Sequence, residues 1–352
     1  MKIKLNAIII SGIILTGAIG CTAQKQGQND QTVKFIKNEA DKKVDVMVDG
    51  KLFTSYMWPD NVYKPILYPL LASTGTPVTR GFPLNPREGE RRDHIHQVGN
   101  WLNYGIVNGY DFWGNGSEGK RNVNGGQIKH SGIQKMTDGL GEGSLQTTAS
   151  WIDPQGQELL AETTEFHFIA KGSTRIIDRI TTLRASGGEV TMKDTKEGSF
   201  GIRVARQLEL PSKDDVVLTE ANGGTTTVKK MSNEGVTGNF KSSEGVTGEA
   251  VWGKRARWMD LYGNIGDEKI SLVIADHPKN LSYPTYWHAR GYGLFAANPF
   301  GVKDFTVGKQ ELNHVIPAGQ TLTLRYRIII NSGTHLSDAQ INAYTDEFAA
   351  KY

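Results

Sequence analysis

The chain has 352 residues, of which 38% are hydrophobic, 22% are charged and 41 are glycine, and this composition excludes disorder as its general state. Its formal net charge of +3 is too small for a basic surface that binds nucleic acid. The one long apolar run is N-terminal and too short to span a bilayer comfortably, which argues against an integral membrane enzyme.

An export signal is predicted at the N-terminus. Lys2 and Lys4 precede an apolar stretch over residues 5–19, and the only cysteine of the chain, Cys21, follows Gly20. This pattern resembles a bacterial lipoprotein signal, so we expect cleavage before Cys21 and acylation of its sulfur. An ordinary secretory signal is the alternative.

The expected acylation of Cys21 indicates the cellular location of the protein. Removal of residues 1–20 leaves a polar segment, residues 21–32, that we expect to be a flexible tether. We therefore expect an exported protein, periplasmic or at the outer membrane, that contacts the membrane through its Cys21 lipid alone. No second thiol remains for cysteine catalysis or a cysteine-based metal site.

Alternating apolar and polar residues dominate the body of the chain, which is typical of β-strands with one buried face. Residues 44–58 alternate on both sides of Asp49 and Gly50, a pair that favours a two-residue hairpin turn. Further strands are predicted over residues 159–169, 174–183, 189–193, 201–208, 270–275 and 321–330. Loops are predicted at the glycine-rich segments 139–143, 222–224, 233–238 and 243–248.

Helical periodicity is confined to the C-terminus. Ser337 and Gln340 form a capping-box pattern before a short helix that ends near Lys351. Because there are no crossover helices and no internal linker, the strands predict one large antiparallel all-β sandwich over residues 33–335, followed by the helical segment 336–352.

Two histidines stand in the first of three windows that are rich in polar and aromatic residues. In an extended segment His94 and His96 share a face, so they can present two imidazoles to one pocket. This arrangement suits acid-base chemistry or two metal ligands. The alternative is a pair of histidines hydrogen-bonded within a loop.

A carboxylate marks the second window. Glu197 precedes Gly198 at the entrance of a predicted strand, where it can project into a cleft. There it would pair with Arg203 or accept a hydrogen bond from a substrate hydroxyl. A surface salt bridge is the alternative.

The third window joins residues 252–260 with residues 276–278 and 286–292, and the last of these stretches includes Trp287, His288 and Arg290. Aromatic faces stack on the C–H patches of a sugar while polar groups bind its hydroxyls, so this window indicates a saccharide. For each tryptophan, burial in the core is the alternative.

Five segments carry a likeness to a known family: residues 65–70, 75–80, 93–96, 107–113 and 287–301. Together they resemble the PmoA-like family of exported bacterial proteins. The resemblance spans most of residues 45–333 and departs from the family pattern at Gln97 and Val98, which counts against a third adjacent histidine. The family label implies a methane oxygenase, but this chain lacks the multiple membrane spans of such an enzyme, so we do not expect that activity.

At the level of fold, the family is similar to the galactose mutarotase β-supersandwich. The resemblance therefore implies a large antiparallel supersandwich with an open sugar cleft. In mutarotases, histidines and carboxylates act as acid and base on a sugar, although no motif aligns those residues with this chain.

The leading hypothesis is a lipid-anchored, carbohydrate-active protein that acts on a saccharide as an epimerase, lyase or hydrolase. No cofactor is expected, because no Walker loop or dinucleotide fingerprint is present. The predicted acid-base residues are His94, His96, Glu197 and His288. The predicted substrate-binding residues are Arg80, Trp101, Arg203, Trp258, Asp260, Trp287, Arg290 and Asn298.

Two alternatives remain open. One is a non-catalytic glycan-binding lipoprotein that uses the same cleft. The other is a metal-dependent enzyme with His94 and His96 as ligands of a divalent metal, for which the sequence shows no third ligand.

Overall fold

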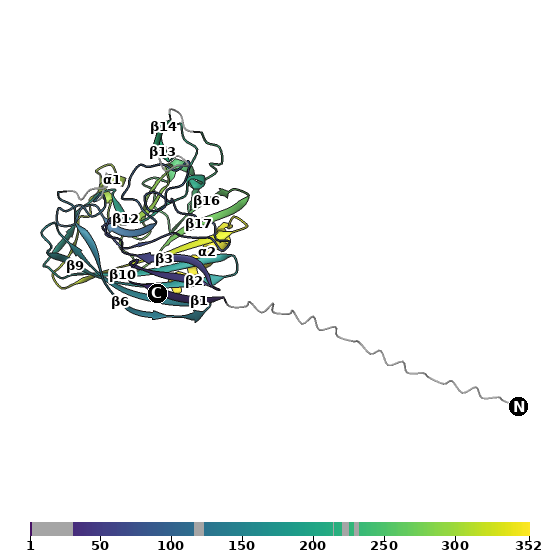
Figure 1. The fold of residues 1–352 in the computed structure, drawn as a ribbon, viewed down its shortest axis with the longest axis horizontal. Helices are drawn as coiled ribbons and strands as arrows, with labels where there is room; N and C mark the ends of the chain where they lie inside the picture. The colour runs from purple at the N-terminus through teal and green to yellow at the C-terminus, as the bar shows by residue number, and fades with distance from the viewer. Residues whose placement is uncertain (2–30, 116–122, 214, 220–224, 229–231) are drawn as a thin grey trace.

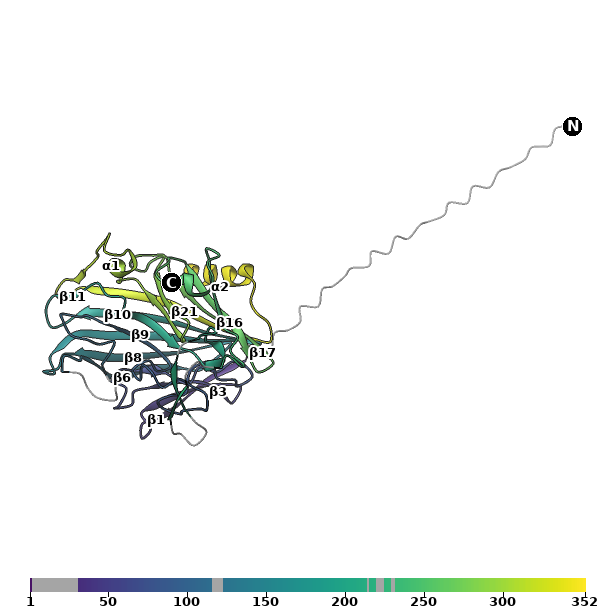
Figure 2. The ribbon, with the colours of Figure 1, turned by 90° about the horizontal axis from the view of Figure 1, so that it is seen from above.

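Two large antiparallel sheets form a sandwich in the computed structural model, and a helix at the C-terminus covers part of one sheet (Figures 1 and 2). The structure describes Met1 and residues 31–115, 123–213, 215–219, 225–228 and 232–352. The predicted all-β class with a short C-terminal helix is confirmed. Residues 2–20 of the predicted export segment, Cys21 and the predicted loop 222–224 lie outside the described residues.

One sheet has nine strands, and the predicted hairpin lies in it. Asp49 and Gly50 both have positive φ angles, 49° and 77°, as the two central positions of a type I′ turn require. In sheet order the strands are β18 (Tyr286–Arg290), β19 (Leu294–Asn298), β12 (Gly198–Arg203), β5 (Asn100–Tyr104), β4 (Ile66–Leu67), β3 (Lys51–Met57), β2 (Lys43–Val48), β1 (Thr32–Asn38) and β7 (Gly139–Leu140).

Two predictions in this sheet are wrong in detail. Gly139–Leu140, inside a predicted loop, forms edge strand β7 against β1. Glycine permits the tight turn that follows, because a Cβ at position 139 would lie 2.1 Å from the carbonyl oxygen of Glu142. The strand predicted over 201–208 ends at Arg203, and Arg206–Leu208 form a 3₁₀ turn instead.

The other sheet has eight strands and contains most of the predicted ones. In order they are β15 (Asn239–Ser242), β16 (Trp258–Ile265), β17 (Glu268–Asp276), β21 (Thr321–Ser332), β10 (Thr174–Ala185), β9 (Glu158–Lys171), β8 (Glu142–Ile152) and β6 (Gln127–Thr137). Two small sheets pair β11 (Val190–Met192) with β20 (His314–Ile316), and β13 (Val216–Thr219) with β14 (Thr225–Val228). Short helical turns are α1 (Val302–Phe305) and a 3₁₀ turn at Gly248–Val251.

The core lies between the two large sheets and fixes which way β18 presents its side chains. Phe200 of β12 stacks on Tyr326 of β21 across the sandwich, with ring centroids 4.7 Å apart. Trp287 and Ala289 of β18 belong to the same core cluster. Because successive side chains of a strand point to opposite faces, His288 and Arg290 point away from the core.

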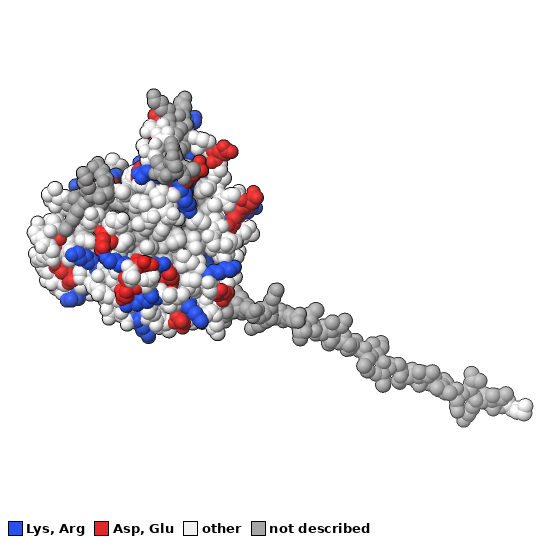
Figure 3. Space-filling model, viewed as in Figure 1, with Lys and Arg blue, Asp and Glu red and all other residues white. Residues whose placement is uncertain are grey.

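The C-terminal helix α2 (Asp338–Lys351) packs on the outer face of the eight-stranded sheet. Its Ile341 and Phe348 are buried, and the capping box of Ser337 and Gln340 is formed as predicted. No helix in the described part of the chain is long and apolar enough to cross a membrane. Cationic and anionic side chains are interspersed on the face that Figure 3 shows, as a net charge near zero leads one to expect.

Candidate functional site

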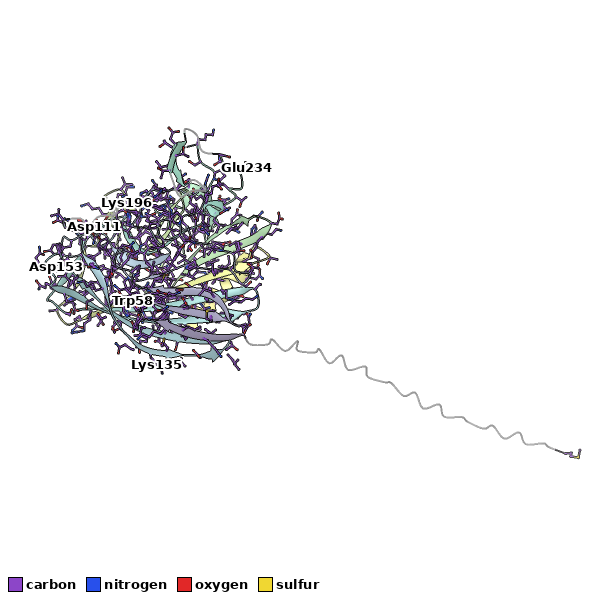
Figure 4. The ribbon with its side chains drawn as sticks, in the orientation of Figure 1. Trp58, Asp111, Lys135, Asp153, Lys196 and Glu234 are labelled. Carbon is purple, nitrogen blue, oxygen red and sulfur yellow. The ribbon has the colours of Figure 1, made fainter. Side chains whose placement is uncertain are left out.

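A cavity of about 560 Å³ lies on the face of the nine-stranded sheet that is turned away from the core. Its size falls within the range of about 300–1,000 Å³ that is usual for small-ligand sites. Asp111 and Lys196, which line it from two different loops, are labelled in Figure 4. The lining residues are His94, His96, Gln97, Gly105, Ile106, Asp111, Trp113, Gly114, Thr195, Lys196, Glu197, His288, Arg290 and Tyr292.

His94 is oriented by the carboxylate next to it. Its Nδ1 lies 2.7 Å from Oδ2 of Asp93. Burial raises the pKa of Asp93, but the hydrogen bond from His94 and the charges of Arg203 and Arg80 outweigh it and hold that pKa well below its usual range. An ionised carboxylate only accepts hydrogen bonds, so Nδ1 donates and Nε2 is the nitrogen that can take a proton.

The backbone at His94 is also unusual. Its φ angle is 45°, in the left-handed region that residues with a Cβ seldom adopt outside tight turns. The amide of Gln97 donates to the carbonyl of His94 at 2.9 Å, so residues 94–97 form a turn. The two histidines therefore meet through a turn and not along an extended strand as predicted, with ring centroids 5.7 Å apart.

Two buried arginines hold this turn. Arg80 donates to the carbonyl oxygens of Asp93, His94 and Gln97 at 2.8, 3.0 and 2.9 Å. Arg203 donates to Oδ1 of Asp93 at 2.7 Å and to Oε1 of Gln97 at 2.6 Å. Neither guanidinium lines the cavity. Both arginines were predicted to bind substrate, but the structure places them behind the wall, where they position the loop.

His96 and His288 are buried in the cavity wall and neutral at pH 7. Burial lowers the pKa of His96 to about 2, helped by the positive charge of Lys64, whose Nζ donates to the His96 carbonyl at 2.6 Å. Burial lowers the pKa of His288 to about 3, helped by Lys196 and Arg290. One ring nitrogen of His288 bonds the backbone of Lys196, and its Nδ1 has no partner among the described residues.

Glu197 reaches the cavity from the entrance of β12. Its carboxylate pairs with the ammonium of its neighbour Lys196 and not with Arg203. The buried amide of Asn298 donates to the carbonyls of Thr195 and Lys196, each at 3.0 Å. Asn298 was predicted to bind substrate, but it holds the loop that carries Glu197.

Aromatic rings close the floor and one side of the cavity. Trp113 is only 3% exposed and lies between the rings of His96 and His288, at centroid distances of 6.4 and 6.3 Å. Trp101, a predicted substrate contact, is buried behind Trp113 at 5.4 Å. Tyr292 stacks on His94 at 4.9 Å. Trp113 thus offers an apolar floor and not an open stacking face.

Three other predicted substrate contacts lie elsewhere. Trp258 and Asp260 belong to β16 of the eight-stranded sheet, where Nε1 of Trp258 donates to Asn342 of α2 at 2.7 Å. Trp287 is fully buried in the core, and its Nε1 donates to the carbonyl of Ala256 at 3.1 Å. Burial in the core, the alternative for each tryptophan, is what the structure shows.

The cavity thus brings together all four predicted acid-base residues and Arg290. Asp111, Trp113, Lys196 and Tyr292 also line it. Lys196 is adjacent to Glu197 and Tyr292 closes the third window, but none of these four residues was assigned a role from the sequence.

Among the described residues, no group of three histidine, cysteine, aspartate or glutamate side chains is arranged to hold a metal ion. The described residues therefore do not supply the third ligand that a metal site at His94 and His96 would need.

The buried histidines make stability depend on pH. An unfolded histidine has a pKa of about 6.5, so between pH 6.5 and 3 the unfolded chain binds more protons at His288 than the folded one does. The free energy of unfolding should fall as pH drops through this window, by at most about 1.4 kcal/mol per pH unit for each such histidine, and be fully retained above it.

Urea unfolding at pH 7, 6, 5 and 4 tests this prediction. His288→Gln should have a shallower slope than the parent, whereas His335→Gln, at an exposed histidine outside the cavity, should keep the parent slope. Other buried histidines such as His277 contribute to the total slope, so only the difference between variants is diagnostic. Equal slopes for the parent and His288→Gln would contradict the prediction.

A family model described as a family of unknown function (DUF6807) matches residues 43–346. No curated protein matches the chain. The PmoA-like label stays a prediction.

Solved structures that match the chain include two galactosidases and a mutarotase-related enzyme. The galactosidase domain of the α-galactosidase-sucrose kinase AgaSK is 7% identical with a TM-score of 0.38, over 85% of this chain and 42% of that one. The GH36 α-galactosidase AgaB from Geobacillus stearothermophilus is 13% identical with a TM-score of 0.39, over 85% and 41%. The galactose mutarotase related enzyme from Lactobacillus acidophilus is 11% identical with a TM-score of 0.29, over 86% and 98%.

The chain spans about two fifths of the length of the two galactosidases it matches. All three TM-scores are below 0.5, so these likenesses carry no argument about activity.

Proposed function

We propose, from the premise that the chain belongs to the DUF6807 family of unknown function, that it binds a saccharide in this cavity and transforms it by acid-base chemistry. The observation that carries the proposal is the convergence of His94, His96, Glu197 and His288, which come from separate parts of the sequence, around one cavity of ligand size.

The groups around the cavity divide into two chemical roles. His94 would be the general base, because Asp93 holds its Nδ1 and leaves Nε2 to take a proton. Glu197 would be the partner that returns a proton. His96 and His288 stay neutral at pH 7, so they would hydrogen-bond sugar hydroxyls and not transfer protons.

Epimerisation, elimination and hydrolysis all need a proton acceptor and a proton donor at fixed positions beside the reacting bond. The pair of His94 and Glu197 meets that requirement without a bound cofactor. The polar side chains in the lining can hydrogen-bond a hydroxylated ligand, and Trp113 supplies an apolar floor for its C–H groups.

One observation favours the second candidate, a non-catalytic glycan-binding protein. The carboxylate of Glu197 is engaged by the ammonium of Lys196, and a carboxylate held in an ion pair is less available to react with a ligand. A binder would still use the cavity but would leave the sugar unchanged.

A substitution that fills the cavity with a larger side chain tests both candidate functions in one experiment. Ile106→Trp places an indole into the cavity from a half-buried lining position, so it should weaken binding of the cognate sugar more than tenfold. The matched control is Val315→Trp, at a 40% exposed position of β20 outside the cavity. Binding and product formation would be followed by NMR on the full chain with a panel of mono- and disaccharides, with and without a chelator.

Each outcome of this panel separates the candidates. Turnover that Ile106→Trp abolishes and a chelator leaves intact supports the acid-base enzyme. Binding without turnover moves the preference to the glycan-binding protein. Turnover that the chelator abolishes and added divalent cation restores indicates the metal-dependent alternative. Unchanged binding in Ile106→Trp would contradict this cavity as the site.

A further inference from the structure

Four charged side chains line the cavity, and three of them are already engaged. Glu197 pairs with Lys196. Oδ1 of Asp111 accepts hydrogen bonds from the amides of Trp113 and Gly114 at 2.9 and 2.8 Å. The fourth is Arg290, which has no carboxylate partner among the described residues.

Arg290 is exposed and directed by its strand. It lies two residues after His288 on β18, so the two side chains share the face that borders the cavity. Its guanidinium lies 5.7 Å from the ring of Trp252, a contact that leaves all five N–H donors available. The nearby carboxylate of Glu249 accepts from the amide of Gly291 at 2.9 Å.

More positive charge lies directly behind the wall. Arg80 and Arg203 share the single carboxylate of Asp93. Arg91 and Arg206 share one oxygen of the buried carboxylate of Glu209, at 2.8 and 2.9 Å. Each cluster therefore carries one positive charge in excess.

These clusters adjoin the lining residue Tyr292. Its neighbour Gly293 packs against the side chains of both Arg203 and Glu209, and the guanidinium of Arg203 lies 4.9 Å from the Tyr292 ring. The charges of Arg203 and Arg80 reach the cavity, because they add to burial and to the charge of Lys64 in lowering the pKa of His96. The pKa of His288 is lowered by burial and by the lining residues Lys196 and Arg290. A cavity in such a field favours an anion over a neutral ligand.

We propose that the cavity selects a saccharide that carries a carboxylate, and that Arg290 binds that carboxylate. The planar fork of a guanidinium matches the two oxygens of a carboxylate, and such charge-assisted pairs are among the strongest hydrogen bonds in proteins. This inference rests on the proposed function and names the substrate class within it.

The test compares sugars that differ only at C6. Glucuronate and glucose, and galacturonate and galactose, form two matched pairs. Calorimetry on the full chain should show the uronate of at least one pair binding about 10- to 100-fold more tightly than its neutral partner, as a hydrogen-bonded charge pair predicts. Raising NaCl from 50 to 500 mM should reduce this ratio, because salt screens an exposed guanidinium.

Substitutions at Arg290 test whether this residue causes the preference for the uronate. Arg290→Gln should bring the ratio of the two affinities to within about twofold, and Arg290→Lys, which keeps the charge but loses the fork, should give an intermediate ratio. Arg184→Gln, at an exposed arginine of β10 outside the cavity, should keep the parent ratio.

Different binding results would overturn the carboxylate assignment and the proposed function. If uronate and neutral sugar bind equally, or if Arg290→Gln keeps the preference, the carboxylate assignment is overturned while saccharide binding stands. If no sugar of either pair binds and none of the wider panel does, the proposed function falls and this inference falls with it.

Discussion

Replacement of His94 by alanine is expected to lower turnover of the cognate saccharide by about 10²- to 10⁴-fold, the usual contribution of a positioned general base. The physical reason is the pair that His94 makes with Asp93, which fixes the tautomer and leaves Nε2 as the proton acceptor. The effect should fall on the rate of the chemical step and much less on binding.

The controls for His94→Ala must separate a loss of turnover from a loss of folding stability. The His94 side chain is 41% exposed, so His94→Ala should leave the free energy of unfolding close to that of the parent. Asp93→Asn is a poorer variant, because it would leave the buried guanidiniums of Arg80 and Arg203 without their counter-ion. His335→Ala, at an exposed histidine far along the sequence from the loop, is the matched control.

Chemical rescue of His94→Ala by imidazole distinguishes a role of His94 in proton transfer from a structural role. Added imidazole should restore part of the turnover of His94→Ala, because it can enter the space that the side chain vacates and accept the same proton. Full turnover in His94→Ala without imidazole would remove this residue from the mechanism. Loss that imidazole does not restore would indicate that His94 shapes the loop and does not transfer the proton.

The four residues that we propose for acid-base chemistry could be singled out from the sequence, because each stood out in its own short segment. His94 and His96 are two residues apart, Glu197 stands next to Gly198, and His288 lies in an aromatic stretch. Their convergence was not predictable, because it depends on long-range pairing. β12 lies between β5 and β19, and that order brings the loop that carries Glu197 beside β18.

Several of the residues predicted to bind substrate do not line the cavity, for two identifiable reasons. Trp287 could have been excluded from the sequence, because alternation along a strand directs it away from the face of His288 and Arg290. Arg80 and Arg203 could not, because burial of an arginine depends on partners far away in the chain. Here Asp93 and the carbonyls of its loop accept their hydrogen bonds.

The fold shows the same division between local and long-range information. The β2–β3 hairpin, the two strands β9 and β10 and the cap of α2 follow local patterns, and all of them were predicted. Strand β7 escaped prediction because Gly139 lies in a run that looks like a loop. Its extended conformation is stabilised by pairing with β1, about a hundred residues earlier in the sequence.

The largest expected loss of stability comes from a buried ion pair between the two strands at the centre of the eight-stranded sheet. Asp178 of β10 and Arg327 of β21 stand directly opposite each other, and both are fully buried. Nε and Nη2 of Arg327 donate to the two carboxylate oxygens at 2.6 and 2.8 Å. Nη1 donates to the carbonyl of Tyr344 in α2 at 2.8 Å, which ties the helix to the sheet.

Arg327→Met should lower the free energy of unfolding by about 3–5 kcal/mol, because it removes the guanidinium that binds both oxygens of the buried Asp178 carboxylate. That carboxylate then keeps only the hydroxyl of Tyr352 at 3.2 Å and the ammonium of Lys351 at 4.0 Å. The double variant Arg327→Met with Asp178→Leu should recover much of that loss, since it removes both charges and refills the space. Lys303→Met, which breaks an exposed pair with Glu311, should cause no measurable change. Urea unfolding measures all three, and hydrogen exchange in α2 should rise in Arg327→Met. If the double variant is no more stable than Arg327→Met alone, an uncompensated charge is not the cause, and the lost anchor of α2 explains the effect instead.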